Sequence, residues 1–214
     1  MQRAVGLMDG ITPNGWDFDV SRETIARLKV IESLLIKWNP KINLVSKNTL
    51  QNLWERHISD SAQTWPLLPA ETKTLVDIGS GGGFPGLVLA ALNGENDFEL
   101  DITMIESDIR KCSFLRTTLR EMSVNAEVKS QRIESADPVG ADVITARALA
   151  DLGQLLDFAE RHLKPGGTAI FPKGINWKKE VEAAQESWSF DLETVKSKTQ
   201  DGAVILKIGE IRRV

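Results

Sequence analysis

The chain has few of the side chains that bind metals or form disulfide bonds. It contains one cysteine, Cys112, and two histidines, His57 and His162, which lie far apart in the sequence. A single cysteine cannot form an internal disulfide bond, and isolated histidines do not give the spacing of a metal-binding cluster. The sequence therefore predicts no disulfide bond and no metal site, and metal catalysis is not expected.

Long apolar runs and a strong excess of positive charge are also absent. No segment approaches the roughly 18 consecutive apolar residues of a membrane span, and the first residues lack the basic-then-apolar pattern of a secretory signal. The formal net charge is −4 and the pI is about 5.4, which argues against a generally basic surface. We therefore expect a cytoplasmic, monomeric protein without membrane contact, in which any nucleic-acid surface is a local patch.

The first 70 residues have the pattern of a helical segment. The stretch that follows Ser21 repeats apolar residues at helical spacing, and Ser21 itself suits the N-cap position. Asn39 and Pro40 are expected to end this helix. A second helical pattern surrounds residues 50–58. We therefore assign residues 1–70 to an N-terminal helical cap.

The remainder, residues 71–214, alternates short apolar strands with helical patterns, which predicts a parallel sheet with crossover helices. Strands are expected at residues 74–78, 101–107, 126–132, 142–147 and 168–173, and helices at 85–92, 110–122, 151–163 and 177–186. Two final strands, 190–196 and 203–208, are joined by a short polar turn and should form an antiparallel hairpin. A mostly parallel, Rossmann-like α/β sheet that ends in such a hairpin is typical of class I methyltransferases that use S-adenosylmethionine (SAM), and we predict this fold.

The segment VDIGSGGGFPG places five glycines between the first strand and the next helix, an order that directs backbone N–H groups at a ligand. Gly81, Gly83 and Gly86 match the G-x-G-x-x-G fingerprint of dinucleotide-binding enzymes, but this register begins two residues after the expected end of the strand. Asp77, followed by Gly79 and further glycines at every second position, matches instead the first motif of SAM methyltransferases. Both cofactor classes stay open on this loop alone.

Further residues limit which atoms could accept a methyl group. Glu106, at the end of the second strand, suits hydrogen bonds from ribose hydroxyls, a role common to both cofactor classes. Carbon-5 methylation of a pyrimidine needs a cysteine nucleophile, but Cys112 lies early in an expected helix. Methylation of an exocyclic amine usually shows an Asn/Asp-Pro-Pro-aromatic element after the fourth strand, where this chain reads TARA. The remaining acceptors are nitrogens with a free lone pair, such as guanine N7, and hydroxyls that need a base.

Several short motifs follow one another along the chain. They are WNPKINL at residues 38–44, HISDS at 57–61, the glycine loop up to FPG, ES, RK and FL within 106–115, RIE at 132–134, ARA at 146–148 and KG at 173–174. In this order they resemble the bacterial small-subunit ribosomal RNA guanine-N7 methyltransferases, the RsmG or GidB family, over residues 25–175. Val45 departs from the family pattern, which has threonine there.

The resemblance implies a SAM-dependent enzyme that methylates N7 of a guanine in 16S rRNA, either free or within a 30S subunit or an assembly intermediate. It implies a SAM site lined by Gly79, Phe84, Ile133, Glu134 and Arg147. The glycine loop and the ribose argument add Gly81 and Glu106. Two alternatives stay open: a nicotinamide-dependent oxidoreductase, and a non-catalytic RNA-binding factor that keeps the fold.

Polar residues near the expected cleft are candidates for RNA binding and for positioning. Arg147 is expected to contact the cofactor, a phosphate or guanine O6 alone, because a bidentate arginine would occupy N7, the atom to be methylated. His57 and Asp60, three residues apart on one helical face, are expected to gate the cleft, to position the guanine, or to act as a polar pair that caps the helix or joins the cap to the sheet. Lys41 and Lys173 are expected to contact phosphates. No residue is predicted to act as a general acid or base.

Overall fold

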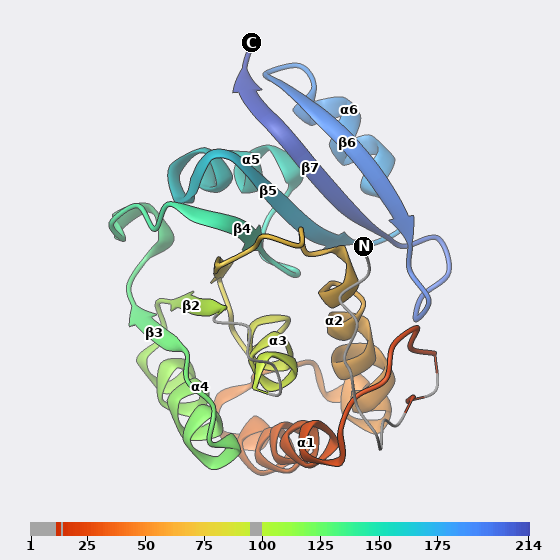
Figure 1. Ribbon diagram of the computed structural model, residues 1–214, viewed down its shortest axis with the longest axis vertical. Helices are drawn as coiled ribbons and strands as arrows, with labels where there is room; N and C mark the ends of the chain where they lie inside the picture. Colours follow the sequence, from red (N-terminus) through yellow and green to blue (C-terminus); the bar gives the residue numbers. More distant parts are fainter. Residues whose placement is uncertain (1–11, 14, 95–99) are drawn as a thin grey trace.

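In the computed structural model, which describes residues 12–13, 15–94 and 100–214, seven strands form one sheet in the order β3-β2-β1-β4-β5-β7-β6 (Figure 1). The strands are β1 (Thr74–Ile78), β2 (Asp101–Glu106), β3 (Glu127–Ser130), β4 (Ala141–Thr145), β5 (Leu163–Lys173), β6 (Trp188–Lys196) and β7 (Val204–Arg213). Strand β7 is antiparallel to both of its neighbours, whereas β1 to β5 pair in parallel. The predicted class I methyltransferase fold and its final hairpin are therefore confirmed.

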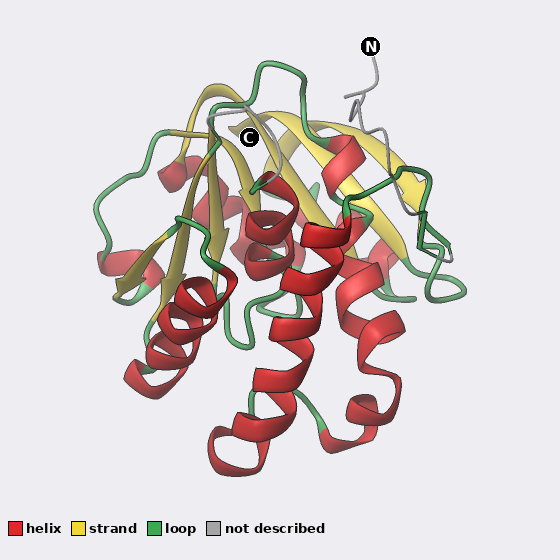
Figure 2. Cartoon of the chain, turned by 60° about the horizontal axis from the view of Figure 1, so that its bottom comes forward, coloured by secondary structure: helices red, strands yellow, loops and turns green. Residues whose placement is uncertain are grey.

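Helices cover both faces of the sheet, as Figure 2 shows. They are α1 (Arg22–Ile42), α2 (Asp60–Ala62), α3 (Gly86–Asn93), α4 (Ile109–Met122), α5 (Leu152–His162) and α6 (Trp177–Ala184). Along β1, Leu75 packs into the core with α1, α3 and α4, while its neighbour Val76 packs into the core with α5 and α6. This alternation is the period of two that a strand buried on both faces requires.

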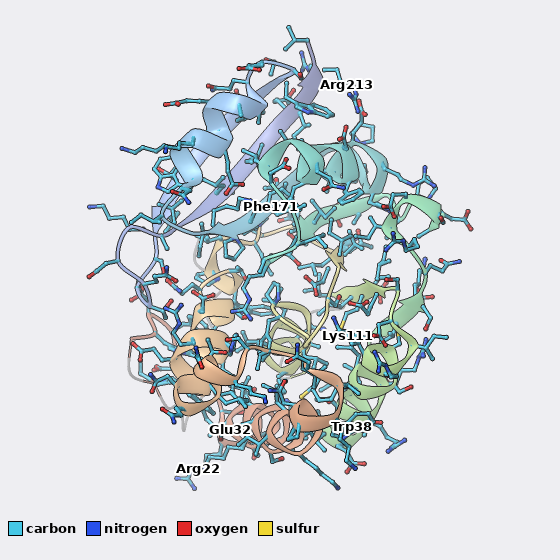
Figure 3. All side chains as sticks on the ribbon, turned by 180° about the vertical axis from the view of Figure 1, so that it is seen from behind. Arg22, Glu32, Trp38, Lys111, Phe171 and Arg213 are labelled. Atoms are coloured by element: carbon cyan, nitrogen blue, oxygen red, sulfur yellow. The ribbon has the colours of Figure 1, made fainter. Side chains whose placement is uncertain are left out.

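The N-terminal segment is packed directly on the sheet domain. Trp38 of α1, labelled in Figure 3, lies edge-on to Phe114 of α4, with ring centroids 5.8 Å apart. Leu28 and Ile31 of α1 are fully buried in the same core as Leu87 of α3. The cap that we assign to residues 1–70, of which 1–11 and 14 lie outside the described residues, thus shares one hydrophobic core with the sheet.

Helix α1 begins as predicted but ends later. Ser21 caps it by accepting a hydrogen bond from the backbone N–H of Thr24. The predicted end at Asn39 and Pro40 is wrong, because the helix continues to Ile42. Pro40 lies on the exposed side of the last turn, where water can replace the one backbone hydrogen bond that proline removes.

The WNPKINL motif forms the end of this helix. Asn43 adopts the left-handed conformation with φ 50° and donates its backbone N–H to the carbonyl of Asn39 at 3.0 Å. The Asn39 side chain then accepts a hydrogen bond from the backbone N–H of Val45 at 2.8 Å. The two asparagines therefore direct the chain from α1 toward the sheet.

The second helical pattern is not one regular helix. It divides into a 3-10 segment at Lys47–Asn52, a π-helical segment at Trp54–Ser59 and the short helix α2. Side-chain periodicity cannot distinguish these forms from an α-helix over so few residues. The wider π-helical turn contains His57, and such turns occur often at functional sites.

Strand β5 begins five residues before the predicted residue 168, and β7 ends at Arg213 instead of residue 208. The added part of β5 includes the exposed segment 164–166, which lacks the apolar pattern used for prediction. None of the described helices is long and apolar enough to cross a membrane.

Candidate active site

A cavity of about 620 Å³ opens at the carboxyl ends of β1, β2 and β4. Ligands of open α/β sheets bind at this edge. All seven residues expected at the cofactor line the cavity: Gly79, Gly81, Phe84, Glu106, Ile133, Glu134 and Arg147. The cavity wall also includes Lys111 of α4, labelled in Figure 3, which the sequence analysis did not select. The fold thus brings the predicted cofactor residues together from four separate segments.

The glycine loop needs glycine for two physical reasons. Gly79, Gly81 and Gly83 have φ values of 61°, 54° and 88°, a left-handed region that other residues rarely adopt. A Cβ atom on Gly79 would also lie 2.5 Å from Cδ1 of Leu149, which lines the cavity. On Gly81 it would meet only the carbonyl oxygen of Gly79, at 3.6 Å. The loop therefore leaves room for a ligand to approach its backbone closely.

Glu106 is held in a fixed orientation at the end of β2. Its Oε2 accepts a hydrogen bond from the backbone N–H of Gly81 at 2.8 Å, and its Oε1 accepts one from the backbone N–H of Asp108 at 2.8 Å. Each carboxylate oxygen has a second lone pair, so both can still accept hydrogen bonds from ribose hydroxyls. The glutamate also fixes the loop, because it ties Gly81 to β2.

Asp77, the acidic residue of the loop motif, lies beneath the loop and not in the cavity wall. Its Oδ1 accepts a hydrogen bond from Thr145 Oγ1 at 3.0 Å, and a Cβ atom on Gly86 would approach its Oδ2 to 2.7 Å. Complete burial raises the pKa of Asp77 to about 6, although hydrogen bonds from Ser80 and Thr145 oppose this shift. Asp77 therefore shapes the loop from below.

Arg147 joins the end of β4 to the N-terminal segment. Its guanidinium donates hydrogen bonds to the backbone carbonyl of Arg56 at 3.0 Å, to Asp60 Oδ2 at 3.1 Å and to His57 Nδ1 at 2.6 Å. The guanidinium carbon also lies 4.9 Å from the centroid of the Phe84 ring. The side chain is only 15% exposed, so these contacts compensate the cost of burying its charge.

The hydrogen bonds around His57 define its tautomer. Arginine has no acceptor, so His57 Nδ1 must accept from Arg147 and Nε2 must carry the proton. Nε2 then donates to Thr49 Oγ1 at 2.8 Å, and Thr49 in turn donates to the carbonyl of Ser46. Burial, with the charges of Arg147 and Arg56, lowers the pKa of His57 to about 3. The imidazole, stacked on Phe84 with ring centroids 5.0 Å apart, is therefore neutral with both nitrogens engaged.

A second cavity of about 390 Å³ adjoins the first and shares His57, Arg147, Ala148 and Ala150 with it. Asp60 also lines it, and Oδ1 of Asp60 accepts a hydrogen bond from Thr199 in the turn between β6 and β7. The pair His57 and Asp60 thus lies at the boundary between the N-terminal segment, β4 and the final hairpin.

The two lysines expected to contact phosphates differ in their surroundings. Lys41 is exposed in the last turn of α1 and lines neither cavity. Lys173 lines the second cavity, but its side chain is 9% exposed and its Nζ donates to the carbonyl of Ala150 at 3.0 Å and pairs with Glu180. The phosphate contact expected at Lys173 stays a prediction, and the ion pair with Glu180 leaves this lysine little exposed. Glu180 and Thr49 were missed because single polar residues on helical segments carry no sequence signal.

The family model described as "rRNA small subunit methyltransferase G" (GidB) matches residues 24–205. The chain belongs to this family. A GidB relative from Ruegeria sp. (strain TM1040), named "Ribosomal RNA small subunit methyltransferase G", is 54% identical over 198 residues, which cover 92% of this chain and 96% of the relative. One from Rhodospirillum centenum with the same name is 49% identical over 194 residues, covering 91% and 88%.

Solved structures show the same fold at low sequence identity. A ribosomal protein L11 methylase from Lactobacillus delbrueckii subsp. bulgaricus aligns with a TM-score of 0.55 and 17% identity, over 75% of this chain and 79% of the other. A SAM-dependent methyltransferase from Aquifex aeolicus aligns with a TM-score of 0.56 and 12% identity, over 78% and 98%. Membership of the GidB family decides between the two cofactor classes in favour of SAM.

Proposed function

We propose that this chain transfers a methyl group from SAM to N7 of a guanine in 16S rRNA. Family membership supports the RNA substrate and the cofactor. The glycine loop and Glu106 fit the cofactor, because the loop leaves its backbone open at Gly81 and the fixed carboxylate can accept hydrogen bonds from ribose hydroxyls. SAM, when bound, supplies an electrophilic methyl group on a sulfonium.

The state of His57 is the observation that carries the N7 assignment. His57 lies at the boundary between the two cavities, but its Nδ1 lone pair accepts a hydrogen bond from Arg147 and its Nε2–H donates one to Thr49. Such an imidazole is a poor general base. Guanine N7 carries a lone pair and no proton, so its methylation requires no base. The positive charge passes to the guanine, and no proton leaves in the chemical step.

Under this proposal, the residues at the boundary between the two cavities act by positioning the guanine and the cofactor. Phe84 stacks on His57, contacts the Arg147 guanidinium and lines the cofactor cavity beside this boundary. Asp60 holds Arg147 and is itself held by Thr199. Fixed walls of this kind align two reactants and remove the entropic cost of bringing them together. We expect the enzyme to act in the cytoplasm as a monomer.

Transfer of labelled methyl from SAM tests the proposal. The chain is incubated with free 16S rRNA, with 30S subunits and with assembly intermediates, each taken from cells that lack the enzyme. Label recovered in 16S rRNA supports the proposal, and the substrate that reacts fastest identifies the form of RNA that is recognised. Binding of SAM and RNA without transfer to any of the three would instead support the non-catalytic RNA-binding factor.

A further inference from the structure

The second cavity has charged groups that the methyl transfer itself does not use. Its volume of about 390 Å³ lies within the range of about 300–1,000 Å³ that small-molecule sites occupy. One part of its wall is His57 and Arg147, which it shares with the cofactor cavity. Lys173, at the end of β5, and Glu180, on α6, belong to the part that is not shared.

These two side chains form an ion pair with unused hydrogen-bonding capacity. Lys173 Nζ has three N–H groups and contacts the carbonyl of Ala150 and the carboxylate of Glu180. Glu180 Oε2 is the atom that Lys173 Nζ contacts, and the Glu180 side chain is 27% exposed. A carboxylate has about four lone-pair sites, and among the described residues Lys173 alone contacts this one. The pair therefore presents one free donor and further acceptor sites in the wall of the cavity.

This pattern matches one nucleobase edge. The Watson–Crick edge of guanine offers the O6 acceptor followed by the N1–H and N2–H donors, and adenine offers a donor followed by an acceptor. We propose that the second cavity receives the target guanine and that Lys173 and Glu180 read its Watson–Crick edge. Lys173 Nζ donates to O6, and the Glu180 carboxylate accepts from N1–H and N2–H. This inference rests on the proposed function.

The placement leaves the reacting atom free. N7 lies on the side of the guanine away from N2, so a base with N1 and N2 at Glu180 can turn N7 toward the wall shared with the cofactor cavity. Arg147, which could otherwise form a bidentate pair with O6 and N7, already donates to Arg56, His57 and Asp60. Adenine in the same position would oppose a donor to Lys173 and an acceptor to Glu180, and sites with unmatched polar groups reject their ligands strongly.

Inosine provides the test, because it keeps N7, O6 and N1–H but lacks the N2 amino group. The guanosine that the parent enzyme methylates is replaced by inosine in an otherwise identical RNA. Then kcat/KM for methyl transfer is measured on both RNAs with the parent, Glu180→Ala and Glu180→Gln. The parent should prefer guanosine by about tenfold or more, which is the effect of losing one hydrogen bond to a charged acceptor. The preference should fall close to one in Glu180→Ala and to an intermediate value in Glu180→Gln, which keeps one acceptor and the side-chain volume.

Controls separate recognition from a structural role. Glu182→Gln removes an exposed charge from the same helix and should keep the preference of the parent. Loss of structure alone would slow transfer to both RNAs equally, so an unchanged preference in Glu180→Ala or Glu180→Gln overturns the inference, as does a parent that methylates both RNAs equally well. A parent that methylates no guanine at N7 contradicts the proposed function instead, so the two failures are distinguishable.

Discussion

Replacement of His57 by asparagine should remove a large part of the pH dependence of stability. In the folded chain the pKa of His57 is lowered from 6.5 to about 3, so the unfolded chain binds a proton that the folded chain does not. The stability that this difference in proton binding contributes is fully present above pH 6.5 and is lost as the pH falls toward 3. Between pH 6.5 and pH 4.5 the loss amounts to about 3 kcal/mol, because each pH unit within this window contributes about 1.4 kcal/mol.

Urea denaturation at pH 7.5 and at pH 4.5 measures the contribution of His57 to the free energy of unfolding. His57→Asn keeps an acceptor for the Arg147 guanidinium but cannot titrate in this range. The difference in free energy of unfolding between parent and variant should therefore shift by about 3 kcal/mol in favour of the variant on going to pH 4.5. Burial also lowers the pKa of His162. Because His162 is present in both proteins, its contribution cancels in the difference between them. A shift below about 0.5 kcal/mol would refute the reasoning, because His57 would then accept a proton in the folded chain as readily as in the unfolded one.

Two further predictions concern the glycine loop and the aspartate beneath it. Gly79→Ala should weaken SAM binding at least tenfold in a calorimetric titration, because its Cβ would meet Leu149 at the cavity. Gly140→Ala, equally left-handed but in open space, should leave the affinity unchanged, and similar losses in both would contradict the explanation. Asp77→Asn should gain about 3 kcal/mol of stability relative to the parent between pH 4 and pH 7, because the raised pKa makes ionisation of the folded parent unfavourable over this range. A difference in the free energy of unfolding that does not change with pH would argue against a raised pKa at Asp77.

The fold was predictable because its strands are buried. Leu75, Val76 and Ile78 make β1 mostly apolar, and the same pattern recurs at β2 and β4, so the strands and their mostly parallel arrangement could be predicted from the sequence. The helix end at Pro40 was not predictable, since its outcome depends on which side of the helix faces solvent. The full length of β5 was not predictable either, because the residues at its start are exposed and lack an apolar pattern.

The site was predictable only where a motif marks it. The glycine loop and Glu106 stand at strand ends and identify the cofactor cavity from sequence. The contacts of Arg147 with His57 and Asp60 join residues about 90 positions apart, and only the packing of the N-terminal segment on β4 reveals them. Glu180 was missed because it gains a role only from its ion pair with Lys173, which the sequence suggested as a phosphate contact and which the structure pairs with Glu180.

Chemical mapping of the methylated atom tests the central claim most directly. Guanine methylated at N7 carries a positive charge, and its imidazole ring is easily reduced. RNA modified by this enzyme should therefore be cleaved at one guanine after borohydride reduction and aniline treatment, whereas RNA incubated without SAM should stay intact at that position. RNA that carries the transferred methyl group and yet resists cleavage would show that the acceptor is another atom, and the assignment of guanine N7 would be contradicted.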